Sequence, residues 1–551
     1  MTEQSAPRVC SGTELLAVFG SGAALSAAAL AWSWQHHALL NYGDAVAHLH
    51  IARRVIDSHR PGLAQLGSVW LPLPHLLLIP FVAVYTWWAD GIAGAIPSML
   101  AYLASCLGLY RLARRRLKPV AAALALAFFA LNPNLLYLQT TSMTEPLFLC
   151  EFVWLIDLLV EWRTRLSSDP ARATRMLWPI AGALVAAIFT RYDGWVLALL
   201  AWSAIGIVLL RRGELRSRTF WLASAAVVAA PLAWFAYNAA FFGDWLDFAR
   251  GPYSAKAIEL RTAAPGGSPH PGWHDPWLSL CYFLKSAEMD AAPESWGTAL
   301  LIVSVLGAAW AWLTAHRRAF NWAMLLWLPL PFYAYSVAYG SVPIFIPVFW
   351  PHSWYNTRYG MELLPAFALG LGFAAQFFLS AVREFKKRWA IYAANLLFGL
   401  AALNALLVLR DRPLTYVEGI KNRDARRPLL EEIPPVLRGL LSTRPGGVIL
   451  METSVYPNLV TCTGIPLRQT INESDKQLYS AALADPAAHA AIVLAFDGDE
   501  IDRAVHAHPE GLIAVGRYHA PGQPSATIYV SSTNSPQQTA RAVIASGKEA
   551  R

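Results

Sequence analysis

The sequence predicts a mainly α-helical protein that crosses a membrane many times and carries a small α/β domain near its C-terminus. The chain of 551 residues is 56% hydrophobic and only 15% charged, and its mean hydropathy is +0.37. Apolar runs, each about long enough to cross a bilayer, recur from Ala17 to Leu409. After Asp411 the charge density rises and the apolar runs shorten, which is typical of a soluble domain.

The positive charge of the chain is better explained by membrane topology than by nucleic-acid binding. The formal net charge is +8. Nineteen lysines and arginines lie in five short clusters between apolar runs, at 111–118, 163–175, 211–218, 316–318 and 383–388. The segments expected on the other side hold nine over a greater length. Because cytoplasmic loops of membrane proteins are enriched in basic residues, we place the clusters and the N-terminus in the cytoplasm and discount nucleic acid.

This sidedness predicts about eleven membrane crossings, with the C-terminus outside. The spans alternate without conflict at 15–35, 91–110, 119–136, 146–162, 177–190, 194–210, 219–240, 296–314, 319–337, 359–381 and 389–409. If the surplus apolar segment 71–90 crossed the membrane, the first basic cluster would lie on the outer side. We therefore expect this segment to be re-entrant or embedded at the outer surface. The Pro-rich run 342–350 is too short to span and is interpreted in the same way.

The predicted domains are a transmembrane domain over 1–410, a periplasmic α/β domain over 411–535 and a disordered tail over 536–551. The first domain includes two outer loops, at 41–90 and 241–296. Strands of the second domain are expected at 448–452, 491–496, 512–518 and 526–530, with helices near 473–484 and 499–507. We interpret the N-terminal apolar run as an uncleaved anchor, with a cleavable signal as the alternative. Of the five cysteines, only Cys281 and Cys462 are expected to face an oxidising compartment.

Five ionisable residues are expected at the outer ends of predicted spans, and none of them in a cytoplasmic loop: Asp44, Glu145, Arg191, Asp193 and Arg358. Charged groups at such depths are costly unless they are paired or solvated, so they are candidates for function. Asp44 begins an amphipathic run to Ile56 that is typical of a helix lying on the membrane surface.

Each of these residues also has a purely structural explanation. Asp44 could cap the helix that it begins, and Glu145, followed by Pro146, could be ordinary helix N-terminal chemistry. Arg191 and Asp193 could be interfacial anchors beside aromatic residues, and Arg358 could extend its charge to the lipid headgroups. All five explanations holding at once, on one side, is less probable than any one alone, which favours a shared site.

The order of these short motifs resembles that of the GT-C membrane glycosyltransferases. The motifs are an acid after the first span, the acid-Pro pair in TTSMTEPLF (140–148), and the Arg-Tyr pair in SWYNTRYGMELLP (353–365). The similarity is to the bacterial branch related to protein O-mannosyltransferases and to the lipid A aminoarabinose transferases. TRYDGW (190–195) and FFGDWLDFARGPYSA (241–255) also look like segments of bacterial members. The resemblance covers about residues 15–410 and implies a GT-C type bundle.

The resemblance implies roles for particular residues. Asp44 corresponds to the first-loop acid, a catalytic base or metal ligand, Glu145 to the second acid, and Arg358 to a contact with the lipid phosphate. Ala45 follows Asp44 where many relatives have a second acid. Where related transferases have a lysine before a Pro-Pro pair, this chain has WLPLPH (70–75), so His75 is the candidate replacement.

The sequence therefore does not decide whether the protein uses a divalent metal ion, and no other cofactor is expected. His48 lies one helical turn after Asp44 and is a weak candidate to share a metal with it, although an interfacial histidine is the simpler explanation.

The predicted reaction moves a hexosyl or pentosyl group from a polyprenyl-phosphate donor to a hydroxyl of a lipid, glycan or protein. A carboxylate such as Asp44 would deprotonate the hydroxyl, and Arg191 and Arg358 offer planar forks to phosphate oxygens. Tyr359 and neighbouring aromatics suit stacking on a sugar, although an aromatic belt also explains them. We place the protein in the bacterial inner membrane. The alternatives are a transporter or flippase for a lipid-linked sugar, which would place ionisable groups near the bilayer midplane, and a non-catalytic assembly protein.

Overall fold

The computed structural model describes residues 10–262, 269–314 and 318–532. The tail expected at 536–551 lies outside the described residues, as does part of the outer loop expected at 241–296. The chain divides into two compact units, one of residues 1–36, 68–74 and 95–418, the other of residues 37–67, 75–94 and 419–551.

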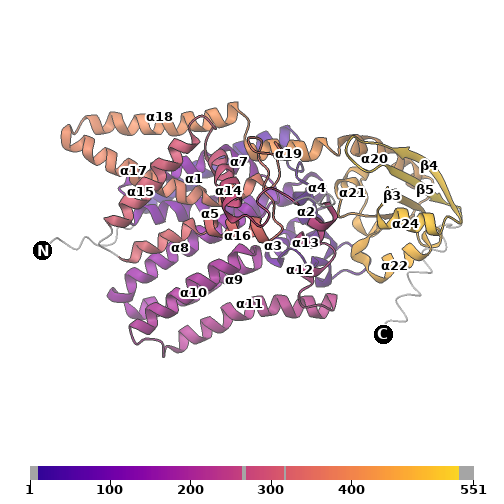
Figure 1. The fold of residues 1–551 in the computed structure, drawn as a ribbon, viewed down its shortest axis with the longest axis horizontal. Helices are drawn as coiled ribbons and strands as arrows, with labels where there is room; N and C mark the ends of the chain where they lie inside the picture. The colour runs from indigo at the N-terminus through magenta and orange to yellow at the C-terminus, as the bar shows by residue number, and fades with distance from the viewer. Residues whose placement is uncertain (1–9, 263–268, 315–317, 533–551) are drawn as a thin grey trace. The chain divides into compact units, whose positions relative to one another are not determined.

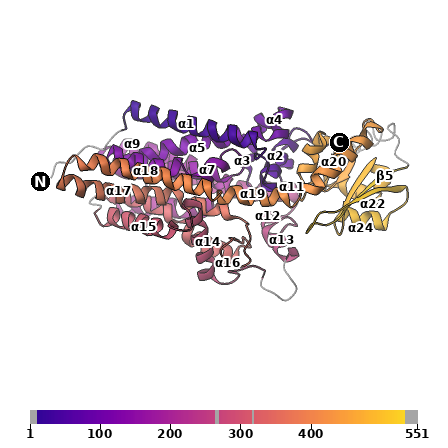
Figure 2. The ribbon, with the colours of Figure 1, turned by 90° about the horizontal axis from the view of Figure 1, so that it is seen from above.

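The first unit is a bundle of helices (Figure 1). α9 packs against α8, α10 and α11 (Figure 1), and α17 packs against both α15 and α18 (Figure 2). The helices are α1 (Gly12–Gln35), α5 (Ile92–Arg114), α6 (Pro119–Ala130), α7 (Pro133–Leu138), α8 (Glu145–Ser168), α9 (Pro170–Thr190), α10 (Asp193–Arg211), α11 (Arg218–Phe242), α12 (Asp247–Arg250), α13 (Ala255–Thr262), α14 (Pro276–Ala291), α15 (Gly297–Leu313), α16 (Pro329–Tyr339), α17 (Leu364–Phe385) and α18 (Trp389–Arg410), with 3-10 helices η2 (Arg318–Trp327) and η3 (Thr357–Leu363).

Seven helical segments among the described residues are long and apolar enough to cross a membrane. They are 12–35, 92–114, 170–190, 193–211, 218–242, 357–385 and 389–424. α8 has the length of a span but carries acids along it, of which Asp157 binds Arg115 at 2.5 Å and Arg111 at 3.1 Å. The fold is therefore the predicted polytopic helical bundle with a small α/β domain, while the number of crossings stays a prediction.

Close helix packing in the bundle depends on small residues. α15 and α17 cross at Gly307 and Gly370, where a Cβ on Gly307 would overlap the carbonyl oxygen of Gly370. Ser304, one turn before Gly307, is fully buried and its hydroxyl donates to the Phe367 carbonyl at 3.1 Å. Small residues at such a crossing let the backbones of two apolar helices approach within van der Waals contact.

The second unit contains a five-stranded sheet in the order β2-β1-β3-β5-β4. β1 (Ile449–Met451) is parallel to β2 (Thr470–Ile471) and to β3 (Ile492–Phe496). β5 (Ala526–Ser531) is antiparallel to β3 and to β4 (Leu512–Tyr518). The four strands expected from the sequence are present, whereas β2 was missed because two residues carry no periodic signal.

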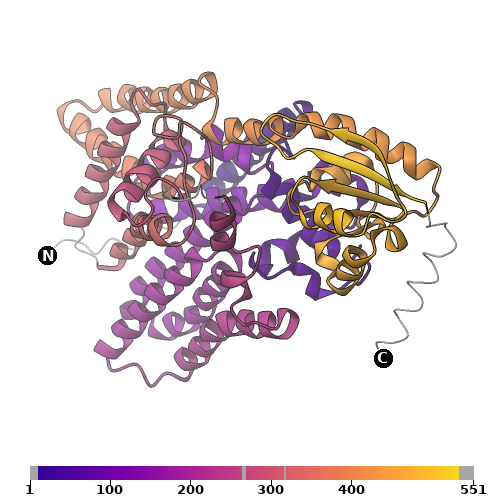
Figure 3. The same cartoon turned by 45° about the vertical axis from the view of Figure 1, so that its right-hand side comes forward.

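Helices cover both faces of this sheet (Figure 3). One core contains buried residues of α20 (Arg427–Ser442) and α21 (Asn458–Thr463), and also of α2 (Gly43–Arg54), α3 (Pro72–Val82) and α4 (Tyr85–Asp90). The other core contains buried residues of α22 (Gln477–Ala484) and α24 (Glu500–Ala507), and α23 (Pro486–His489) packs against α22 and β5. The helix α19 (Leu414–Asp424) contributes residues up to Glu418 to the first unit and the remainder to the second.

This division differs from the boundary expected at 410–411, because most of the outer loop 41–90 packs with the C-terminal residues. Leu49 and Ala52 of α2 are buried in the same core as Leu429 and Ile492. An amphipathic helix must bury its apolar stripe, but its own sequence does not identify the partner. The 11 residues of α3 and the 6 of α4 are too few to cross a bilayer.

Candidate functional site

The first unit gathers four of the predicted residues, Glu145, Arg191, Asp193 and Arg358, into one buried ion network. Glu145 begins α8, Arg191 and Asp193 occupy the junction of α9 and α10, and Arg358 lies in η3. These residues come from helix ends, where backbone groups lack partners within the helix and polar side chains are accommodated.

Arg191 is the centre of this network. Its Nε donates to Asp193 at 3.1 Å, its Nη1 to Thr144 at 3.1 Å and to Glu145 at 3.3 Å, and its Nη2 to Tyr333 at 2.9 Å. Nη2 also lies 3.2 Å from Glu362. A guanidinium has five N–H groups, so each already has an acceptor within reach. A phosphate could bind Arg191 only by displacing one of these partners.

Glu145 joins the two arginines of the network. Its Oε1 accepts from Arg358 Nε at 3.0 Å, as well as from Arg191. Arg358 Nη1 in turn donates to Glu418 at 2.8 Å. Arg358 is 4% exposed and Glu145 is 1% exposed, so removing one partner would leave a buried charge uncompensated.

Tyr359 lies close to both guanidinium groups. The centroid of its ring is 5.0 Å from Arg191 Cζ and 5.2 Å from Arg358 Cζ. Its ring also stacks on Tyr333 at 5.3 Å. The negative faces of an aromatic ring attract both cations, so Tyr359 helps to hold two like charges in one network.

Acids outnumber bases in this part of the bundle. Asp290 is buried at the end of α14, and neither of its carboxyl oxygens has a hydrogen-bond partner among the described residues. Its Oδ2 lies 2.6 Å from the position of a Cβ on Gly360, so η3 approaches α14 closely here. With Glu145, Asp193, Glu362 and Glu418, five carboxyl groups stand against two guanidinium groups. The excess of carboxyl groups distinguishes this site, because unpaired buried charges are costly.

Asp44 belongs to the second unit and lies in the first turn of α2. The N-cap of this helix is Tyr42, which makes no side-chain capping bond, so Asp44 does not occupy the capping position that its sequence context allowed. The N–H of Gly43 instead donates to the Asn422 side chain at 3.1 Å. The charge of Asp44 acts on Arg426, whose pKa is lowered by burial and raised again by Asp44 and Tyr456.

His48 and His75 bind each other in the second unit. Their Nδ1 and Nε2 atoms are 2.8 Å apart, so one imidazole donates a proton and the other accepts it. His48 is 4% exposed and His75 has no exposed surface. No group of three or more His, Cys, Asp or Glu residues in the described ranges is arranged to hold a metal ion. The pair Asp44 and His48 therefore does not fit a metal site by itself.

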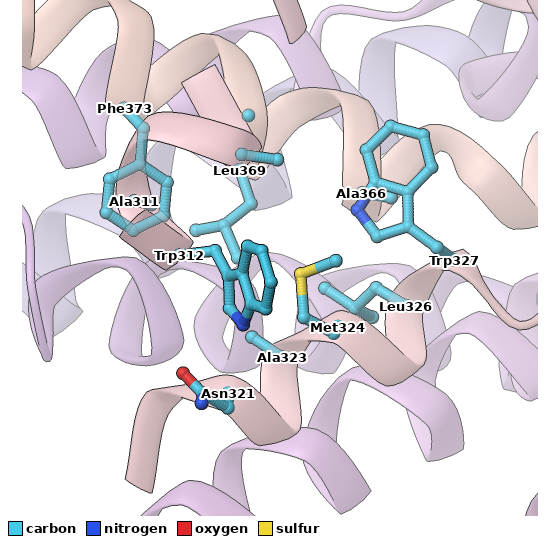
Figure 4. A pocket seen from close by; sticks show the side chains of 12 residues that line it. Ala311, Trp312, Asn321, Ala323, Met324, Leu326, Trp327, Ala366, Leu369 and Phe373 are labelled. Carbon is cyan, nitrogen blue, oxygen red and sulfur yellow. The ribbon is translucent and has the colours of Figure 1, made fainter. Parts of the chain in front are cut away.

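An apolar pocket lies in the first unit between α15, η2 and α17 (Figure 4). Trp312, Met324, Trp327 and Phe373 line it, and Asn321 is the one amide side chain among its lining residues. Such a lining accepts hydrocarbon rather than a charged group. The pocket is therefore separate in character from the ion network.

Three residues of the network were not predicted from the sequence. Glu362 lies four residues after Arg358 within a segment interpreted as a span, and an acid inside an apolar run was the signal that could have identified it. Tyr333 resembles any aromatic residue of a membrane helix. Glu418 follows Asp411 and was assigned to the soluble domain, so no sequence signal connected it with Arg358.

All five cysteines, Cys281 and Cys462 included, are free.

Comparison with known proteins identifies the fold. No protein-family model matches the chain, and no curated protein matches it in sequence. Among solved structures, the chain is similar to the crystal structure of ArnT from Cupriavidus metallidurans bound to undecaprenyl phosphate, with a TM-score of 0.54 and 12% identity. The match covers 95% of this chain and 99% of that chain. The fold is therefore of the GT-C type expected from the motif order.

Proposed function

We propose that this protein is a membrane glycosyltransferase that moves a sugar from a polyprenyl-phosphate donor to an acceptor hydroxyl. The observation that carries the proposal is the fold similarity over almost the whole chain to a transferase crystallised with undecaprenyl phosphate. The buried network of Glu145, Arg191 and Arg358 supports it, because such a network at helix ends is expensive to maintain without a role. We place the reaction at the outer face of a bacterial inner membrane, with the N-terminus cytoplasmic and the C-terminal domain periplasmic.

In the proposed reaction Asp44 is the general base. The acceptor hydroxyl attacks the anomeric carbon of the donor while Asp44 takes its proton, and the bond to the lipid phosphate breaks with the electron pair leaving on phosphate. The leaving phosphate needs charge neutralisation rather than a proton. Arg358 supplies it, held in orientation by Glu145 and Glu418 on two sides of its guanidinium.

The remaining predicted residues receive supporting roles. Arg191, bound by Asp193, holds Glu145 and Tyr359 in place, and Tyr359 stacks on the sugar. We also assign His75 to the substrate site. Its hydrogen-bond partner is His48. No step is routed through a metal, because Asp44 and His48 alone are an incomplete set of ligands.

The test pairs transfer rate with donor affinity. The purified protein is incubated with labelled undecaprenyl-phosphate sugars, including hexoses and an aminopentose, and donor hydrolysis is measured without acceptor. Asp44→Asn keeps the size of the side chain, and we expect turnover to fall ~10²–10⁴-fold with donor binding retained. Near-parental turnover in this variant would remove Asp44 as the base, and failure of the parent with every donor would count against the proposed function.

A further inference from the structure

Two residues that follow the last predicted span hold the start of α2, where Asp44 lies. The Asn422 side-chain oxygen accepts from the Gly43 N–H at 3.1 Å and from Arg426 Nη1 at 3.3 Å. Asn422 lies in the last turn of α19, and Arg426 is the N-cap of α20. Nearly four hundred residues of sequence separate these contacts from α2, so they are not local helix-capping interactions.

Gly43 lies directly beneath the guanidinium group of Arg426. It begins α2 with ordinary helical geometry, and it is absent from the residues with positive φ. A Cβ at this position would overlap Arg426 Nη1, and it would lie 3.2 Å from Arg426 Cζ. The absent side chain therefore leaves room for the guanidinium group rather than for a special backbone conformation.

The placement of Arg426 needs a negative charge nearby. The guanidinium lies against the N-terminus of α2, where the helix dipole is positive and repels a cation. Asp44, in the same first turn, is the carboxylate whose charge favours the ionised form of Arg426. The arrangement thus places one cation beside the first turn that carries the carboxylate to which we assign the chemistry.

We propose that Arg426 and Asn422 are positioning residues for Asp44. Asn422 caps the first turn of α2, and the Arg426 guanidinium, seated over Gly43, restrains the orientation of the Asp44 carboxylate. This inference rests on the proposed function of Asp44 as the base. It also gives the C-terminal domain a part in the reaction, although the domain carries no residue that touches the donor in the proposed mechanism.

The first experiment changes Arg426 and follows kcat and donor KM separately, with the labelled undecaprenyl-phosphate sugar that the parent turns over. A misplaced catalytic group typically costs up to ~10²-fold, so we expect Arg426→Ala to lower kcat ~10- to 100-fold and to leave KM within about twofold. Arg426→Lys keeps a cation and should restore most of the loss. The matched control is Arg427→Ala, the next residue, whose exposed ion pair with Glu431 is on the helix surface.

A second experiment needs no substrate. Thermal unfolding of the full-length protein in detergent is measured for Gly43→Ala, Arg426→Ala and the double variant. The added methyl group displaces a guanidinium only while Arg426 is present, and alanine otherwise favours a helix over glycine, so Gly43→Ala should be less favourable in the parent than in Arg426→Ala. Equal effects of Gly43→Ala in both backgrounds would overturn the proposed position of the Arg426 guanidinium against Gly43.

The outcomes separate this inference from the proposed function. Parental kcat in folded Arg426→Ala, together with an inactive Asp44→Asn, would overturn the positioning role and leave the base intact. A raised KM with parental kcat would make Arg426 a substrate contact, which also overturns it. If Asp44→Asn is fully active, the assignment of the base fails, whatever Arg426 does.

Discussion

Replacing Glu418 by Gln should destabilise the first unit through the loop that carries Arg358. Glu418 is 4% exposed and accepts four hydrogen bonds. Its Oε1 accepts from the Asn356 N–H at 2.9 Å and from Arg358 at 2.8 Å. Its Oε2 accepts from the Thr357 N–H at 3.0 Å and from the Thr357 hydroxyl at 2.5 Å. The substitution changes one oxygen to an NH2 group with little change in volume.

The expected cost follows from these four contacts. An NH2 group cannot accept, so one buried backbone N–H, of Asn356 or of Thr357, loses its partner whichever way the amide turns. An unsatisfied buried donor costs ~1–3 kcal/mol, and hydrogen bonds to a charged acceptor contribute ~1.5–3 kcal/mol. Because these penalties overlap, we expect a total loss of about 2–4 kcal/mol in the free energy of unfolding.

The assay is thermal unfolding of the purified protein in detergent, followed by intrinsic tryptophan fluorescence. Glu418→Gln should lower the unfolding temperature by several degrees. Glu431→Gln, at an exposed i,i+4 pair with Arg427, is the control and should leave it unchanged. An unfolding temperature of Glu418→Gln equal to that of the parent would refute the assignment of Glu418 as the acceptor that fixes this loop.

Two further outcomes follow from the structure. Arg358→Lys cannot reach Glu145 and Glu418 together from one ammonium group, so the affinity for undecaprenyl phosphate should fall by ~1–3 kcal/mol; parental affinity of Arg358→Ala would contradict the phosphate contact. Burial, followed by the charges of neighbouring acids, raises the pKa of Glu452 in the α/β domain to about 7. The folded state therefore binds this proton more tightly than the unfolded chain, and stability should fall by ~1–2 kcal/mol as the pH rises from about 4.5 to 7. Glu452→Gln should remove that fall, as measured by hydrogen exchange of β1 at several pH values, and an unchanged pH dependence would exclude Glu452 as its source.

The sequence predicted the grouping of Glu145, Arg191, Asp193 and Arg358 because charge in an apolar chain is easy to locate. The distribution of basic residues placed all four on the same side of the membrane. The structure brings them into one network. The continuous apolar run of β3 and the partly alternating pattern of β5 were also visible. These properties depend on short windows of sequence, which is why they could be predicted.

The partners of these residues depend on tertiary packing and could not be predicted. Glu418 reaches Arg358 across 60 residues of sequence, and Asn422 reaches Gly43 across 379. The sequence near Asp57 or Leu49 shows an amphipathic helix but does not say what covers its apolar face. For the same reason the expected boundary at 410–411 separated the outer loop 41–90 from the residues with which it shares a core.

That shared core has a consequence for how the protein is made. Leu49, Ala52 and Trp88 emerge from the ribosome early, but their core partners, such as Ile433 and Leu494, are synthesised almost last. At ~5–20 residues per second, the early segment waits for roughly 20–80 seconds before its apolar face can be covered. During that interval it must be shielded by lipid or by a chaperone. A chain truncated after α18 would lack these partners permanently, and Asp44 would then lie on a helix without its core.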